Sequence, residues 1–256
     1  MFFFDPFYLL FMAPAMILMF WAQSRVKGTY AKYSQVTTSS GLPGYMVAQR
    51  LLRSVGLESV HTAPGQRADP ERRQALADSG VVSIERVGGQ LSDHYDPAKK
   101  TLRLSEGVYD SNSVAAMAIV AHETGHAIQD QVRYPALVLR STLVPAVRFG
   151  STFGYLVIIG GFVMMMLGAA IGESIAWLGV MLFSLTLVFS LVTLPVEFDA
   201  SKRALVLLQN NGITNQQELD ASRRVLNAAA LTYVAAMAAS LMQILYWVFI
   251  LLGRRD

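Results

Sequence analysis

Four apolar segments limit the folds open to this chain. A helix needs about 20 apolar residues to cross a bilayer, and each segment approaches or exceeds that length. They are Phe7–Ala22, Phe149–Ile171, Ile175–Val196 and Leu226–Leu252. Backbone polar groups inside hydrocarbon must be hydrogen-bonded within their own segment, so each is expected to be a helix. The sequence therefore predicts a mainly α membrane protein with four transmembrane helices.

Composition agrees with this prediction and excludes several other classes. The chain has 256 residues, of which 53% are hydrophobic and 15% charged, with a mean hydropathy of +0.39. Soluble domains carry about 25% charged residues. The chain has no cysteine, which excludes disulfides and thiolate metal sites. The net charge is only +3, and no basic patch is interleaved with aromatic residues, so no nucleic-acid partner is expected.

The apolar segments differ in their expected roles. Phe7–Ala22 is short, and a cleaved signal peptide is the alternative. Basic residues follow this segment instead of preceding it, and no small-residue cleavage site ends it, which favours an uncleaved anchor. Only Gly172–Ser174 separates the two central segments, which predicts a tight hairpin. The last segment exceeds one crossing, so its first turns are expected in the protein core or at the interface.

Basic residues in the loops predict the orientation of the bundle. With four spans, these residues fall on one side: Arg25, Lys27, Lys32, Arg133, Arg140, Arg148, Lys202, Arg203, Arg223 and Arg224. The positive-inside rule then places residues 23–148 and 197–225 in the cytoplasm and both termini outside. The terminal pair Arg254 and Arg255 opposes this orientation.

The polar region between the first two spans is expected to be an α+β domain. A helix is predicted from Leu42 to Ser54, and a loop with a short helix over Pro64–Gly80. Three short strands follow, separated by turns at Gly88-Gly89 and at Asp96–Lys100. These strands are Val81–Val87, Gln90–His94 and Thr101–Ser105. Because each turn reverses the chain, the pattern predicts a small antiparallel sheet.

A His-Glu-x-x-His pattern follows that sheet at His122, Glu123 and His126. The preceding run from Ser113 to Ala121 has no helix breaker, and residues four apart on a helix share one face, so both imidazoles can reach one metal ion. Glu123 is placed to take a proton from the attacking water. The alternative is a core helix with two hydrogen-bonded histidines, but it would bury Glu123 without a cation at high cost.

A catalytic zinc site usually has a third protein ligand. His61 and His94 are upstream candidates, and Glu197 is a downstream one, because it directly follows an apolar span. The predicted hairpin returns the chain to the same side of the membrane, which favours Glu197. Asp199 could orient a histidine, or it could be a helix cap or a surface charge.

The His-Glu-x-x-His pattern and the segment that begins at Glu197 resemble those of the YugP-like neutral zinc metallopeptidases of bacterial membranes. The resemblance is carried by Leu91–Pro97, Leu102–Ser105, Ala121–Ala127 and Glu197–Ser201, and it extends over nearly the whole chain. The layout also resembles HtpX- and Ste24-type membrane peptidases. The resemblance implies a zincin-like domain in a bacterial inner membrane, with Zn²⁺ held by His122, His126 and Glu197 and with Glu123 as general base. One departure is Ser201, where the HtpX-type pattern has aspartate.

Further roles can be assigned from the chemistry that peptide hydrolysis needs. The oxyanion of the tetrahedral intermediate needs a donor, for which His94 and Tyr233 are candidates. Thr101–Ser105 is expected to offer a strand edge to an extended peptide. The predicted segments are an N-terminal transmembrane anchor (1–22), a zincin-like domain with the motif helix (23–148), a transmembrane hairpin (149–196), a helical segment with the third ligand (197–225) and a C-terminal transmembrane helix (226–256).

Two functions are compatible with these features. The first is a multi-pass membrane zinc endopeptidase that cleaves membrane or membrane-near proteins, with its active site facing the cytoplasm. The alternative is a non-catalytic zinc-binding membrane scaffold or assembly factor, which would not need Glu123. The expected partners are the lipid bilayer and a protein or peptide substrate. Whether a membrane-protein partner or a second copy of the chain also binds stays open.

Overall fold

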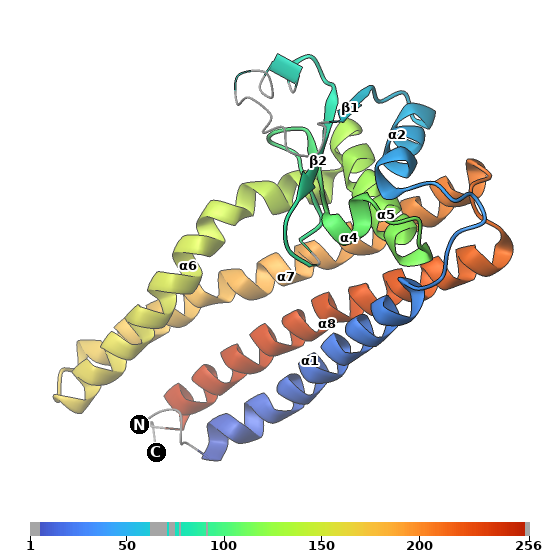
Figure 1. Ribbon diagram of the computed structural model, residues 1–256. Helices are drawn as coiled ribbons and strands as arrows, with labels where there is room; N and C mark the ends of the chain where they lie inside the picture. Colours follow the sequence, from blue (N-terminus) through green and yellow to red (C-terminus); the bar gives the residue numbers. More distant parts are fainter. Residues whose placement is uncertain (1–5, 62–70, 72–74, 77, 91, 254–256) are drawn as a thin grey trace. The chain divides into compact units, whose positions relative to one another are not determined.

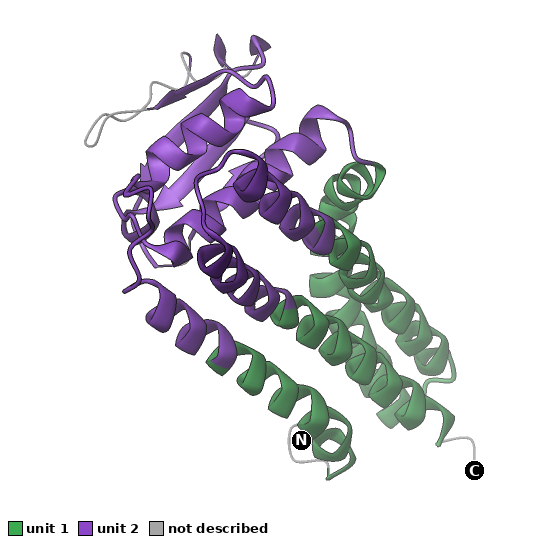
Figure 2. Ribbon diagram, turned by 90° about the vertical axis from the view of Figure 1, so that its right-hand side faces the viewer, with its two compact units in different colours: residues 1–24, 135–196, 231–256 green, residues 25–134, 197–230 purple. Residues whose placement is uncertain are grey.

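The computed structural model is mainly α-helical (Figure 1). It describes residues 6–61, 71, 75–76, 78–90 and 92–253, so most of the predicted Pro64–Gly80 loop lies outside the described residues. Two compact units are present, and Figure 2 colours them separately. Unit 1 comprises residues 1–24, 135–196 and 231–256, and unit 2 comprises residues 25–134 and 197–230.

Four long apolar helices are found, as predicted. They are α1 (Pro6–Tyr33), α6 (Pro135–Met166), α7 (Ile171–Asn210) and α8 (Gln216–Leu252). Each is long and apolar enough to cross a membrane. Within unit 1 many large apolar side chains face outward, such as Leu10, Phe20 and Leu167, while Phe162 and Trp247 are buried. Outward apolar surface of this kind suits contact with lipid better than with water.

The turn of the membrane hairpin differs from the prediction. Helix α6 ends at Met166, and the chain reverses at Gly168, whose φ of +80° favours glycine. The predicted turn at Gly172–Ser174 is wrong, because these residues lie inside α7. Gly172 serves a different purpose there: a Cβ at this position would lie 2.6 Å from the backbone nitrogen of Met165. Its lack of a side chain lets the two helices of the hairpin pack closely.

Unit 2 contains a four-stranded sheet in the order β1-β2-β4-β3. The strands are β1 (Ser59–His61), β2 (Val82–Val87), β3 (His94–Asp96) and β4 (Thr101–Ser105). The predicted antiparallel sheet is wrong, because β1, β2 and β4 are mutually parallel and only β3 pairs antiparallel, with β4. The sheet is therefore mixed, and β1 was missed by the sequence pattern.

Burial explains why the strands pair in this way. Leu102 and Leu104 of β4 are fully buried and Thr101 with them, as expected for a central strand covered on both faces. The second predicted turn forms, because Asp96 Oδ1 accepts the backbone N–H groups of Ala98 and Lys99 and aligns β3 with β4. Consequently β4 is internal, not the predicted free edge, and β3 is the edge strand beside it, with β1 at the opposite edge of the sheet.

Among the described residues, unit 2 also contains the helices α2 (Gly44–Ser54), α4 (Glu106–Tyr109) and α5 (Val114–Gln131). Helix α5 begins after Ser113, whose hydroxyl accepts the Ala116 N–H at 3.2 Å. Leu51 of α2, Met117 of α5 and Ile84 of β2 share one buried core. The motif helix is thus held from two sides, which fixes the direction of its histidines.

Candidate metal centre

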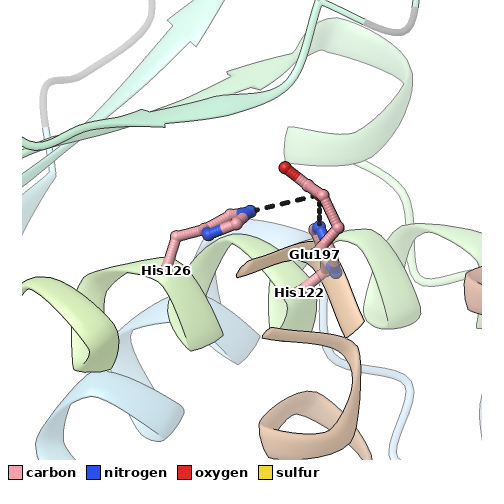
Figure 3. Close-up of side chains that lie close together, drawn as sticks. All are labelled: His122, His126 and Glu197. Carbon is pink, nitrogen blue, oxygen red and sulfur yellow. Dashed lines mark hydrogen bonds and ion pairs between the residues drawn. The ribbon is translucent and has the colours of Figure 1, made fainter. Parts of the chain in front are cut away.

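Helices α5 and α7 bring three potential metal ligands together (Figure 3). His122 and His126 are one turn apart on α5, and Glu197 comes from α7. Glu197 Oε2 lies 3.2 Å from His122 Nε2 and 3.6 Å from His126 Nε2. The donor atoms of all three residues lie within 4.8 Å of one another. Residues distant in the sequence therefore form one compact donor set.

The donor set fits zinc by type and spacing. Two imidazole nitrogens and one carboxylate oxygen are common ligands of catalytic zinc, and ligands about 2 Å from a tetrahedral ion lie roughly 3.3 Å apart. The measured separations of 3.2 and 3.6 Å bracket this value. Glu197 is only 2% exposed and His126 is buried, whereas His122 is partly exposed. A buried carboxylate of this kind requires a positive partner.

The electrostatics of the site favour positive charge. Burial by itself lowers the pKa of His126, but the hydrogen bond to Glu197 and the nearby carboxylates of Glu123 and Glu197 outweigh it. The pKa of His126 therefore lies above its usual value. His126 Nε2 is the nitrogen that faces Glu197, and a metal cation bound there would take the place of a proton on it.

A close approach of the two helices makes the cluster possible. Gly125 of α5 faces the backbone of α7, and a Cβ at this position would lie only 2.6 Å from the carbonyl oxygen of Ala200. Any larger residue would force α5 and α7 apart. Since Glu197 is one turn before Ala200 on α7, this contact sets how near Glu197 comes to the histidines.

Gly125→Ala is expected to weaken zinc binding and to destabilise unit 2, because overpacking of this kind costs about 1–3 kcal/mol. Zinc affinity by chelator competition and the thermal unfolding midpoint would measure both effects. Gly28→Ala on α1 is the matched control, since nothing lies within 4 Å of its added Cβ. Unchanged zinc affinity in Gly125→Ala would show that this helix contact does not position Glu197.

Glu123 is anchored to the edge strand. Its Oε2 accepts the backbone N–H of Tyr95 at 2.9 Å, and its side chain is buried. The N–H of Tyr95 thus points away from β4 and toward the motif helix. The carboxylate next to the first histidine is therefore held in one orientation by a rigid element.

Comparison with known proteins decides the family. The family model described as "Putative neutral zinc metallopeptidase" matches residues 8–73 and 71–252. The chain is also 41% identical over 242 residues to the "Putative membrane protease YugP" of Bacillus subtilis (strain 168), covering 94% of this chain and 95% of that protein. This chain belongs to the neutral zinc metallopeptidase family. The predicted resemblance is thereby confirmed, and no solved structure matches the chain.

The structure places the other predicted site residues of this chain outside the donor set. His94 is exposed on β3, with Nδ1 2.8 Å from the Ser92 carbonyl and Nε2 3.2 Å from Arg103. His61 is exposed on β1, and its ring lies 5.6 Å from that of Tyr45. Tyr233 belongs to unit 1, whereas the donor set belongs to unit 2. The oxyanion roles of His94 and Tyr233 stay predictions.

The partners of the two histidines differ from each other. Ser201 Oγ lies 3.2 Å from His122 Nδ1, so this serine occupies the place expected for an aspartate. His126 Nδ1 lies 2.9 Å from Gln129 Oε1. Asp199 contacts Gln129 and neither histidine directly. Sequence reasoning missed Gln129, although its position three residues after His126 on the same helix was a usable indication.

Proposed function

We propose that this metallopeptidase is a membrane-embedded zinc endopeptidase that cleaves membrane or membrane-near proteins at the cytoplasmic face. The observation that carries the proposal is the buried cluster of His122, His126 and Glu197, with Glu123 beside it. A structural zinc site would normally have four protein ligands and no neighbouring base, whereas three ligands leave a position open for chemistry. The names of the family and of the relative support proteolysis.

The residues of the site have separate roles in peptide hydrolysis. His122, His126 and Glu197 would hold the zinc, which when bound polarises the scissile carbonyl and acidifies water. Glu123 takes the proton of the attacking water and later passes it to the leaving amine. Its hydrogen bond from the Tyr95 N–H keeps the carboxylate aligned during both transfers. Glu123, His126 and Glu197 are buried, which strengthens the electrostatic effect of these groups.

The edge strand offers a way to hold the substrate. Strand β3 pairs with β4 on one side only, and its neighbour across the other side is the motif helix. We place an extended substrate segment along this edge, where main-chain hydrogen bonds would align the scissile bond. The preference for membrane-near segments rests on Glu197, which directly follows an apolar stretch of α7.

The activity can be tested with the purified protein in detergent. Wild type is expected to cleave an unstructured protein, to lose this activity after treatment with a zinc chelator and to regain it when zinc is returned. The same chelator saturated with zinc beforehand is the control and should leave cleavage intact. A wild-type protein that binds zinc yet cleaves no member of a broad substrate panel would instead support the scaffold function.

The cytoplasmic face is a separate part of the proposal. Basic residues in the loops support it, because they gather in residues 23–148 and 197–225. A reporter fused after Asp256 is expected to read external, and one inserted in the loop after α7, at Gly212, to read cytoplasmic. Cytoplasmic readings from both positions would contradict the four-span orientation.

A further inference from the structure

A chain of polar groups leads from His126 to a second acidic residue on α7. Gln129 is completely buried, and its Oε1 lies 2.9 Å from His126 Nδ1. Its Nε2 donates to Asp199 Oδ2 at 2.8 Å. Asp199 also accepts from Arg203 Nε, and the Arg203 guanidinium lies 5.8 Å from the centre of the Tyr134 ring. The chain of contacts thus runs from His126 through Gln129 to Asp199, which Arg203 holds in place.

The chemistry of these groups gives the chain a direction. A carboxylate can only accept hydrogen bonds, so the amino group of Gln129 must face Asp199. The carbonyl of Gln129 must then face His126, which requires a hydrogen on His126 Nδ1. The lone pair of a neutral His126 is left on Nε2, the nitrogen that faces Glu197.

We propose that Gln129 and Asp199 are positioning residues that fix the tautomer in which His126 binds zinc. This inference rests on the proposed zinc site and goes beyond it by assigning two residues that do not touch the metal. Histidine ligands are usually oriented by a carboxylate, a carbonyl or water. Here the carboxylate acts through a neutral amide, so the negative charge of Asp199 does not lie directly against the histidine.

The other ligand histidine lacks such control. Ser201 Oγ is the group near His122 Nδ1, and a hydroxyl can rotate to donate or to accept. Ser201 therefore does not select a tautomer of His122. The two histidines of the motif are held differently, and His126 is the one whose metal-binding nitrogen is determined by the surrounding residues.

The test exchanges the amide of Gln129 and the carboxylate of Asp199. In Asp199→Asn, the introduced amide and the Gln129 amide can both rotate, so the Gln129 carbonyl no longer has to face His126. In Gln129→Glu, two carboxylates face each other. Each single variant is expected to bind zinc about 10–100-fold more weakly. The double variant Gln129→Glu/Asp199→Asn restores an acceptor toward His126 and a donor behind it, and it should recover most of the affinity. A purely structural role would not produce this reciprocal rescue.

Zinc affinity would be measured by chelator competition, with Asp220→Asn as the control because it removes an exposed carboxylate elsewhere in unit 2. The chain has only four histidines, so nitrogen-15 labelling of histidine can follow a slowly exchanging Nδ1–H of His126. This resonance should be present in wild type and lost in Asp199→Asn. Two results would overturn the positioning role of Gln129 and Asp199. One is wild-type zinc affinity in Asp199→Asn, and the other is a double variant whose zinc affinity is as low as that of the weaker single variant. Such a result would not contradict the proposed peptidase function. A protein that binds zinc but cleaves nothing would contradict the proposed function and leave the role of Gln129 and Asp199 standing.

Discussion

Replacing Glu123 by glutamine is expected to reduce peptide hydrolysis by roughly 10²–10⁴-fold while zinc binding is retained. Glutamine has nearly the same shape, and its carbonyl oxygen can still accept the Tyr95 N–H that Glu123 now accepts. It cannot take a proton from water, however, so the chemical step fails. The measurement is turnover of an unstructured protein beside zinc content by elemental analysis.

Glu106→Gln is a suitable control for this variant. Glu106 is an exposed acidic residue of α4 in the same unit, where it pairs with Arg86, and its replacement should leave turnover unchanged. If Glu123→Gln kept wild-type turnover, another residue would have to act as the base. If the variant lost zinc together with activity, the distinction between base and ligand drawn for Glu123 would be wrong.

Glu197→Gln should lower zinc affinity by more than the 10–100-fold typical of residues that only orient a ligand. Glu197 is the sole carboxylate of the three-residue donor set, and it lies between both histidine nitrogens. An amide oxygen is a poorer zinc ligand than a carboxylate and brings no negative charge. Activity should fall with the zinc occupancy and recover in part at high zinc concentration.

Glu173→Gln makes the same exchange in the first turn of the same helix and should bind zinc like wild type. Both variants can be compared by titration with a fluorescent zinc chelator. Full zinc stoichiometry with wild-type affinity in Glu197→Gln would assign the third ligand to another residue. His61 and His94 would then be tested in turn, although the structure places both on exposed strands.

Local patterns were enough to predict that the long helices of this protein exist, although not where α7 begins, and α4 was missed. Length and composition identified α1, α6, α7 and α8, because an apolar run of membrane length has few other stable conformations. The run from Ser113 to Ala121 without a helix breaker indicated the first half of α5, and the structure adds the cap, a Ser113 hydroxyl that accepts the Ala116 N–H. The spacing of His122 and His126 placed both on one face, since helix geometry alone determines it.

Strand partners and turn positions depended on contacts that no local pattern contains. The hairpin turn at Gly168 and the inward-packed Gly172 are both glycines between apolar segments, and only their packing distinguishes them. The strand order likewise follows from the burial of Leu102 and Leu104 on a central strand. A Gly-Gly pair predicts a reversal but does not specify which strand the returning chain joins.

The candidate site, too, could be predicted in part from local sequence and depends in part on packing. Glu197 could be proposed from its place after an apolar span, but its approach to His122 depends on the packing of two helices. Asp199 was one candidate for orienting a histidine, with a helix cap or a surface charge as the alternatives, and the intervening amide of Gln129 could not be anticipated from charge alone. The hydrogen bond from Tyr95 to Glu123 involves a backbone group, which leaves no mark in the sequence.

The two unspecified positions of the His-Glu-x-x-His pattern have little mutational tolerance in this chain. Thr124 is completely buried and its hydroxyl donates to the Val120 carbonyl at 2.8 Å, while Gly125 lies against Ala200. Saturation mutagenesis of these positions would therefore return only small side chains at Thr124 and essentially glycine at Gly125. In this protein all five positions of the pattern are constrained: three by the chemistry proposed for the metal site, Thr124 by burial within its own helix, and Gly125 by the backbone of α7.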